Sequence, residues 1–135
     1  MAVVKQRSAC PISNSLEAWG DKWSLLIIRD LMFAKQLTYG DFLKAPEKIA
    51  TNILAARLQA LEENSIITKT VHPESRAKFL YQLTQKGIDL YPLMVEINLW
   101  AEKYYPIPEE RKPLLALIHK DKEAFIKKSI EALTK

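Results

Sequence analysis

The chain has 135 residues, of which 48% are hydrophobic and 27% charged, a composition typical of one folded domain and not of a disordered chain. Its formal net charge of +4 is a mild excess that fits binding to a polyanion without requiring it. A single cysteine excludes an intramolecular disulfide framework, and no apolar run reaches the roughly 18 residues that a membrane span needs.

The N-terminal third predicts two helices. Pro11 opens a short helix that ends at Gly20, with Ser13 or Asn14 as its capping side chain. Asp21 then caps a second helix over residues 22–33. The apolar residues at helical spacing, which we expect to face the core, are Trp23, Leu26, Ile27, Leu31 and Phe33.

The next segment predicts a helix-turn-helix. Thr38 can cap a short helix that ends before Pro46. After a turn at residues 46–48, apolar residues recur at helical spacing over residues 51–63 and predict the second helix. Small and polar side chains in its first turn suit a helix that enters the major groove of DNA. The alternative is an ordinary solvated amphipathic helix, which the turn before it and the hairpin after it disfavour.

Residues 66–71 and 78–83 are rich in β-branched and aromatic residues and predict a β-hairpin around a turn at residues 72–76. His72, Arg76 and Lys78 lie at or near its tip, where cations can reach a phosphate or a narrow minor groove. A solvated tip with incidental charge is the alternative. Together with the preceding helices, this hairpin predicts a winged helix-turn-helix.

A long helix is expected from Gln85 to about Tyr104, bent at Pro92. Its apolar residues lie on two sides, so it needs two partners, one of which we expect to be the same helix of a second subunit. Residues 113–134 predict one or two short terminal helices that pack on that partner. The fold class is therefore mainly α with a small β-hairpin wing, with additional N- and C-terminal dimerisation helices.

Five stretches, taken together, resemble the HxlR-type winged-helix regulators, relatives of the MarR group. They are residues 10–12, 20–31, 39–43, 49–54 with 57–58, and 81–87. The length predicts a single domain over residues 1–135. The resemblance covers a core at about 10–105, and a C-terminal helical extension follows at about 106–135. Thr38, Lys48 and Ser65 depart from the family pattern, the last two where glycine is usual.

Because the start of the chain lacks an apolar signal segment and no run is long enough to span a membrane, we expect a cytoplasmic protein. The resemblance implies a sequence-specific transcriptional regulator that binds double-stranded DNA as a homodimer. Its two recognition helices would enter successive major grooves of a pseudo-palindromic operator, with half-sites roughly 34 Å apart. Thr51, Asn52 and Arg57 are expected near base edges. The residues expected to contact phosphate or the minor groove are Lys48, His72, Arg76 and Lys78.

Two further features are candidate sensor sites. Cys10 lies just before a helix N-terminus, which favours the reactive thiolate, and in several members of the family the cysteine at this position responds to oxidants or electrophiles. The alternative is a small residue that anchors the N-terminal arm. Trp23, Tyr91 or Trp100 could line a pocket for a small aromatic effector, although aromatic residues at helical spacing more often belong to the core.

Other functions receive less support from the sequence. The fold also permits a protein-interaction module that does not read DNA. His72 and His119 are far apart in the chain, no Cys or His cluster has metal-ligand spacing, and no nucleophile motif is present. We therefore expect neither a metal, nor a cofactor, nor enzymatic activity, and no association with a membrane.

Overall fold

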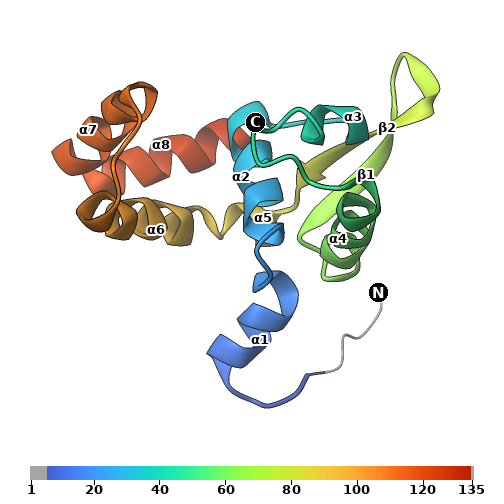
Figure 1. Ribbon diagram of the computed structural model, residues 1–135, viewed down its shortest axis with the longest axis horizontal. Helices are drawn as coiled ribbons and strands as arrows, with labels where there is room; N and C mark the ends of the chain where they lie inside the picture. Colours follow the sequence, from blue (N-terminus) through green and yellow to red (C-terminus); the bar gives the residue numbers. More distant parts are fainter. Residues whose placement is uncertain (1–5, 135) are drawn as a thin grey trace. The chain divides into compact units, whose positions relative to one another are not determined.

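The computed structural model describes residues 6–134 and divides into two compact units, Met1–Gly87 and Ile88–Lys135 (Figure 1). The first unit contains helices α1 (Pro11–Trp19), α2 (Ser24–Ala34), α3 (Tyr39–Phe42) and α4 (Thr51–Glu63), then strands β1 (Ile67–His72) and β2 (Ser75–Leu83). Helix α5 (Gln85–Ile88) lies at the boundary. The second unit contains α6 (Tyr91–Tyr104), the 3-10 turn η1 (Glu109–Arg111), α7 (Lys112–Lys120) and α8 (Lys122–Thr134). In residues 6–134, no helix is long and apolar enough to cross a membrane.

Helix α1 begins and ends close to the predicted positions, but its cap differs. Cys10 is the N-cap residue, Pro11 occupies the first turn, and no side chain caps the helix. The prediction that Ser13 or Asn14 supplies the cap is wrong, because Pro11 is already helical and draws both residues into the helix. The helix ends at Gly20, where an added Cβ would lie 2.4 Å from the Leu16 carbonyl oxygen.

The N-cap residue of α2 is Trp23, which makes no side-chain cap hydrogen bond, and the helix starts two residues later than predicted. Asp21, the predicted cap, lies before it. The carboxylate of Asp21 accepts hydrogen bonds from the backbone N–H groups of Trp23 and Ser24, both at 2.9 Å, which satisfies two of the otherwise unpaired donors of the first turn. Ile27 and Leu31 are buried as predicted. Phe33, however, is 60% exposed, because two residues advance a helix by about 200° and carry it to the opposite face from Leu31.

Helix α4 has the predicted bounds, whereas α3 ends at Phe42 and the connection to α4 spans residues 43–50, longer than the turn predicted at residues 46–48. Thr38 and Asp41 form a capping box at the start of α3, and α4 spans Thr51–Glu63. Its N-cap is Ala50, so no side chain caps it. Lys48, before α4, and Ser65, after it, have φ angles of 55° and 60°, the left-handed conformation that glycine adopts without strain. Asn64, the C-cap residue of α4, has an ordinary φ of −84°.

The hairpin packs its inner face on the helices. Ile67 pairs with Leu83, Lys69 with Tyr81, and Val71 with Phe79. Because side chains alternate between the two faces of a strand, these three pairs lie on the same face of the hairpin. Tyr81 is buried and meets the ring of Phe42 edge-on, with centroids 6.0 Å apart. The reversal is tighter than expected, because His72 already pairs with Ser75.

The helix expected over residues 85–104 is two helices. Helix α5 ends at Ile88, and α6 starts at Tyr91 with Pro92 in its first turn. Proline lacks the N–H that an interior position needs but fits the first turn of a helix, so it begins α6 and does not bend a longer helix. In the second unit, α6 contributes Val95 to a buried cluster with Leu115 and Ile118 of α7.

Candidate nucleic-acid interface

The outer face of α4 carries small and uncharged side chains over its first three turns. The residues exposed there are Thr51, Asn52, Ala55, Ala56 and Gln59, while Leu54, Leu58 and Leu61 are buried on the opposite side. Figure 1 shows α4 beside β1, with the tip of the hairpin projecting beyond the helices. The structure therefore presents a helix face with small side chains and a projecting wing on the same unit.

Arg57 does not lie on this outer face. It is half-buried, and its Nη1 lies 3.4 Å from Oδ2 of Asp21, which precedes α2. Partial burial by itself raises the pKa of Asp21, but hydrogen bonds from Ser24 and Trp23, together with the charge of Arg57, lower it below the ordinary value. Asp21 thus stays ionised near neutral pH and ties α4 to the start of α2. The DNA contact expected of Arg57 stays a prediction.

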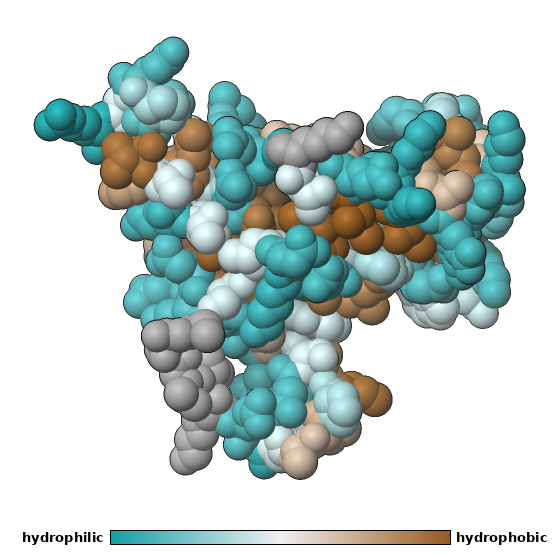
Figure 2. All heavy atoms as spheres, turned by 180° about the vertical axis from the view of Figure 1, so that it is seen from behind, coloured by the Kyte–Doolittle hydropathy of each residue, from teal (hydrophilic) through white to brown (hydrophobic). Residues whose placement is uncertain are grey.

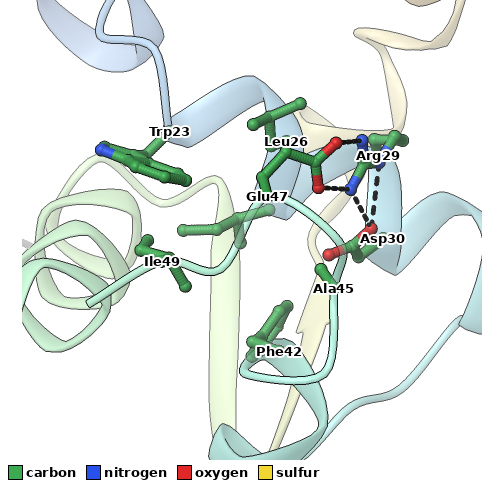
Figure 3. Close-up of a pocket in the computed structure, with 9 residues that line it drawn as sticks. Trp23, Leu26, Arg29, Asp30, Phe42, Ala45, Glu47 and Ile49 are labelled. Carbon is green, nitrogen blue, oxygen red and sulfur yellow. Dashed lines mark hydrogen bonds and ion pairs between the residues drawn. The ribbon is translucent and has the colours of Figure 1, made fainter. Parts of the chain in front are cut away.

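The turn between α3 and α4 is fixed by a forked ion pair. The guanidinium of Arg29 donates to both carboxylate oxygens of Glu47, at 2.7 and 2.9 Å, and also to Asp30 (Figure 3). The hydrogen bonds to Glu47, followed by the contact with Asp30, raise the pKa of Arg29 despite its partial burial. Glu47 directly precedes Lys48, so this pair holds the strained residue that leads into α4.

A second contact fixes the start of α4. The hydroxyl of Tyr39, the first residue of α3, donates to the backbone carbonyl of Thr51 at 2.6 Å. Thr51 opens α4, so the two helices are joined at the end of α4 that reads DNA in helix-turn-helix proteins. Lys48, Thr51 and Asn52 are all exposed beside this junction.

The Trp23 side chain lines a small pocket with Leu26, Phe42 and Ile49, closed on one side by the Arg29–Glu47 pair (Figure 3). Its volume is about 10 Å³, room for about one water molecule. Tyr91 and Trp100 belong to the second unit and do not line it. Tyr91 packs on Phe125, whereas Trp100 is exposed beside Tyr104. The proposed effector pocket at Trp23, Tyr91 or Trp100 stays a prediction.

The wing carries its cations at the tip. Arg76 and Lys78 are exposed and form no ion pair among residues 6–134. His72 is half-buried, and its Nδ1 accepts a hydrogen bond from the backbone N–H of Glu74 at 3.0 Å, so this nitrogen is turned into the reversal. Figure 2 shows hydrophilic side chains at the tip of the hairpin and a small hydrophobic patch just below it, where Val71 and Phe79 are exposed.

The sequence analysis did not assign DNA contacts to Gln59, Lys44 or Lys69, although all three are exposed on the helix-turn-helix and wing. Lys69 lies over the ring of Phe79, 4.3 Å from its centroid. Helical periodicity alone could have favoured Gln59 over Arg57. From Asn52, seven residues return to the same face within about 20°, whereas five residues lead about 140° away.

Cys10 is exposed as the N-cap residue of α1. Its backbone N–H donates to the hydroxyl of Ser8 at 3.1 Å. No group of three or more His, Cys, Asp or Glu within the described part of the chain is arranged to hold a metal ion.

Helices α3 and α4, joined by a turn at residues 43–50 and followed by a two-stranded hairpin, define a winged helix-turn-helix. The HxlR-like helix-turn-helix family model matches residues 18–109, and the chain belongs to this family of DNA-binding transcriptional regulators.

Known proteins similar to the chain include other regulators of this type. It is 34% identical over 89 residues to the HTH-type transcriptional regulator sll1512 of Synechocystis, a match that covers 66% of this chain and 65% of sll1512. It is 32% identical over 96 residues to the regulator YodB of Bacillus subtilis, covering 70% and 85% of the two chains.

Solved structures of other transcriptional regulators are also similar to this chain. The crystal structure of PA1607 is 40% identical, with a TM-score of 0.66 over 76% of this chain and 70% of that one. Reduced YodB is 31% identical, with a TM-score of 0.60 over 72% and 95%. YodB has also been solved with a quinone bound, at 29% identity, a TM-score of 0.60 and coverage of 70% and 99%.

Proposed function

We propose that the protein is a sequence-specific transcriptional regulator that binds a pseudo-palindromic operator as a homodimer. The observation that carries this proposal is the exposed outer face of α4, whose start is held by the Tyr39–Thr51 contact. Thr51, Asn52 and Arg57 are the proposed contacts near base edges. Lys48, His72, Arg76 and Lys78 are the proposed contacts to phosphate or the minor groove.

A homodimer would place two copies of α4 in successive major grooves, roughly 34 Å apart. Support for a second copy comes from apolar side chains that each unit leaves exposed. In α1 these are Ile12 and Leu16, and in α6 they are Ile97, Trp100 and Tyr104. Contiguous exposed apolar side chains of this kind often mark interaction surfaces.

The first test is fluorescence anisotropy with labelled DNA from the region upstream of the gene and with a shuffled duplex, titrated with salt. We expect tighter binding to the upstream DNA and affinity that falls with salt, by about 0.9 log units per log unit for each phosphate contacted. Equal affinity for the two duplexes would mean that the operator lies elsewhere. Absence of binding even at low salt would favour the protein-interaction module.

The wing contribution is tested with a pair of double variants. Replacing Arg76 and Lys78 with alanine should reduce the salt slope by about 1.8, since two phosphate contacts are lost. Replacing Lys127 and Lys128, two exposed lysines of α8, removes the same charge and should leave the slope unchanged. An equal reduction of the salt slope in both double variants would mean that binding depends on the net charge of the protein and not on phosphate contacts made by the wing.

Cys10 is proposed as a sensor of oxidants or electrophiles. Its exposure and its position at the start of α1 support this role, as does the similarity to YodB, which has been solved in reduced, quinone-bound and diamide-treated forms. As the only cysteine of the chain, it could form a disulfide only with another chain or a small thiol.

Diamide or a quinone should change DNA binding by the wild-type protein and leave the Cys10→Ser variant unaffected. The same response in both proteins would assign Cys10 the structural role instead. A small aromatic effector remains part of the proposal, and its pocket, predicted at Trp23, Tyr91 or Trp100, is tested by the same titrations in the presence of aromatic ligands.

A further inference from the structure

The outer face of α4 lacks a positive charge. Its exposed side chains over the first three turns are hydroxyl, amide or methyl groups, and the two that follow, Glu62 and Glu63, are acidic. Arg57 is the only Lys or Arg in the helix, and its guanidinium is turned to the carboxylate of Asp21. No Lys or Arg side chain on this face can therefore read a base, and over its first three turns only uncharged groups are available.

The chemistry of these groups selects among base pairs. In the major groove, Asn and Gln side chains pair with N6 and N7 of adenine, and the methyl groups of Ala and Thr contact the 5-methyl group of thymine. Guanine is read chiefly by Arg or Lys at O6 and N7. The outer face offers Asn52 and Gln59 for adenine and Ala55 and Ala56 for thymine.

Gln59 is already held in an orientation that suits adenine. Its Nε2 donates to a carboxylate oxygen of Glu63 at 3.2 Å, and a carboxylate can only accept, so the amide nitrogen must face Glu63. The second hydrogen on Nε2 and both lone pairs of Oε1 remain available. Adenine needs one donor, for N7, and one acceptor, for the N6 amino group. Glu63 is thus a positioning residue for Gln59.

The spacing of the two amides sets the distance between the adenines. Asn52 and Gln59 are seven residues apart on one face, a rise of about 10.5 Å. Successive base pairs are stacked about 3.4 Å apart, so a helix lying along the groove would place the two amides about three base steps apart. Ala55 and Ala56 lie between them on the helix.

We propose that α4 reads an A·T-rich half-site in which two A·T pairs about three steps apart meet Asn52 and Gln59, with thymine methyl groups against Ala55 and Ala56. This inference rests on the proposed DNA-binding function and specifies its target. Affinity for the operator then comes from phosphate contacts at Lys48 and the wing, while base preference comes from the uncharged face.

Selection from a library of random duplexes by the purified full-length protein tests the proposal. We expect enrichment of inverted half-sites with A·T pairs at the contacted positions. Enriched half-sites whose core is G·C would overturn this inference and leave the DNA-binding function intact. A library that shows neither enrichment nor binding at low salt would overturn both.

Modified bases in the selected duplex identify the groups that are read. Deoxyuridine in place of thymidine removes the 5-methyl group, and 7-deazaadenine removes N7. Each should weaken binding about tenfold at a contacted position and have little effect outside the half-sites. Unchanged affinity for both modified duplexes would overturn the proposed contacts.

A change of specificity provides the sharpest test. The Gln59→Arg variant should prefer G·C at one position of each half-site, because Arg pairs with guanine O6 and N7. Ala77→Arg adds the same charge at an exposed position of the wing and should raise affinity for all duplexes without altering that preference. An unaltered base preference in Gln59→Arg would exclude Gln59 as a reading residue.

Discussion

Arg57 of α4 and Asp21, which precedes α2, form an ion pair with Nη1 and Oδ2 3.4 Å apart. The same carboxylate accepts two backbone hydrogen bonds from the first turn of α2. The Asp21 side chain therefore contacts both the start of α2 and Arg57, which lies on the side of α4 away from its exposed outer face.

Replacing Asp21 with alanine should lower the free energy of unfolding by about 1 to 2 kcal/mol, the usual cost of losing a side chain that accepts hydrogen bonds from the first N–H groups of a helix. The pKa of Asp21 is lowered from 3.8 in the folded state, so the carboxylate stabilises the fold above pH 3.8 and loses this effect as pH falls through the folded-state pKa. The difference between wild type and Asp21→Ala, measured by urea unfolding, should be full at pH 7 and shrink below about pH 3.8. A pH-independent difference would contradict the role of the charge.

Arg57→Ala separates a supporting role from a DNA contact. If the ion pair with Asp21 persists on DNA, the variant should lose a few tenths of a kcal/mol to about 1 kcal/mol of stability and keep the salt slope of DNA binding. A slope reduced by about 0.9 would show that Arg57 reaches a phosphate. Anisotropy titrations in several salt concentrations measure the slope, and urea unfolding measures the stability.

The forked Arg29–Glu47 pair should show measurable coupling in a double-mutant cycle. Arg29→Gln and Glu47→Gln should together reveal an interaction of about 1 kcal/mol, because the geometry is bidentate and the Arg29 side chain is largely buried. The pair Lys112–Glu109, which is exposed on both sides, serves as the control and should couple by less than about 0.5 kcal/mol. Equal coupling in both pairs would mean that burial of Arg29 adds nothing.

Lys48 places a positive charge at a strained position, so two substitutions should separate the two effects. Lys48→Gly relieves a positive φ of 55° and should stabilise the protein by up to about 1 kcal/mol, whereas Lys48→Ala should not. Both variants should weaken DNA binding and reduce the salt slope by about 0.9. Weaker binding by only one of them would argue against a simple phosphate contact.

The sequence predicted the helix-turn-helix closely because its signals are local. Thr38 and Asp41 form their capping box within one turn, and the spacing of Leu54, Leu58 and Leu61 alone sets the buried face of α4. The break between α5 and α6 was missed because Pro92 is compatible both with a bent helix and with the first turn of a new one.

Contacts between residues that are far apart along the chain could not be predicted from the sequence. Glu47 is 18 residues from Arg29, and no local pattern indicates that the two side chains meet. The role assigned to Arg57 likewise followed from residue type, whereas its direction is set by the helical phase relative to Leu54 and Leu58. A side chain long enough to reach DNA can equally reach a carboxylate on a neighbouring helix.

Replacing the two helical glycines, Gly87 and Gly40, with alanine should change the stability of the protein in different ways. A Cβ at Gly87 would lie 2.4 Å from the Ile66 carbonyl oxygen and 2.8 Å from Cδ2 of Leu83, so Gly87→Ala should destabilise the wing base by about 1 to 3 kcal/mol. A Cβ at Gly40 of α3 would meet nothing within 4 Å, and Gly40→Ala should be neutral or stabilise by up to about 1 kcal/mol. Thermal unfolding of the two variants checks both, and equal stabilities would contradict the close approach at Gly87.

The exposed aromatic side chains of α6 provide the test of the proposed dimer. Trp100 is 57% exposed, and its ring centroid lies 5.2 Å from that of Tyr104. Tryptophan is among the residues that contribute most to protein interfaces, with losses of about 2 kcal/mol or more on truncation. If a second copy covers this side of α6, Trp100→Glu should weaken dimerisation more than tenfold in sedimentation velocity runs over a range of concentrations.

Leu117 of α7 is 56% exposed, so Leu117→Glu introduces the same charge at a matched exposure and should leave the dimer intact. Circular dichroism should show both variants folded, because exposed substitutions change stability by only about 0.5 kcal/mol. Loss of the dimer in Trp100→Glu should also weaken operator binding, since each half-site then binds one copy independently. A dimer that survives Trp100→Glu would place the contact between subunits elsewhere, with the exposed Ile12 and Leu16 of α1 as the next positions to change.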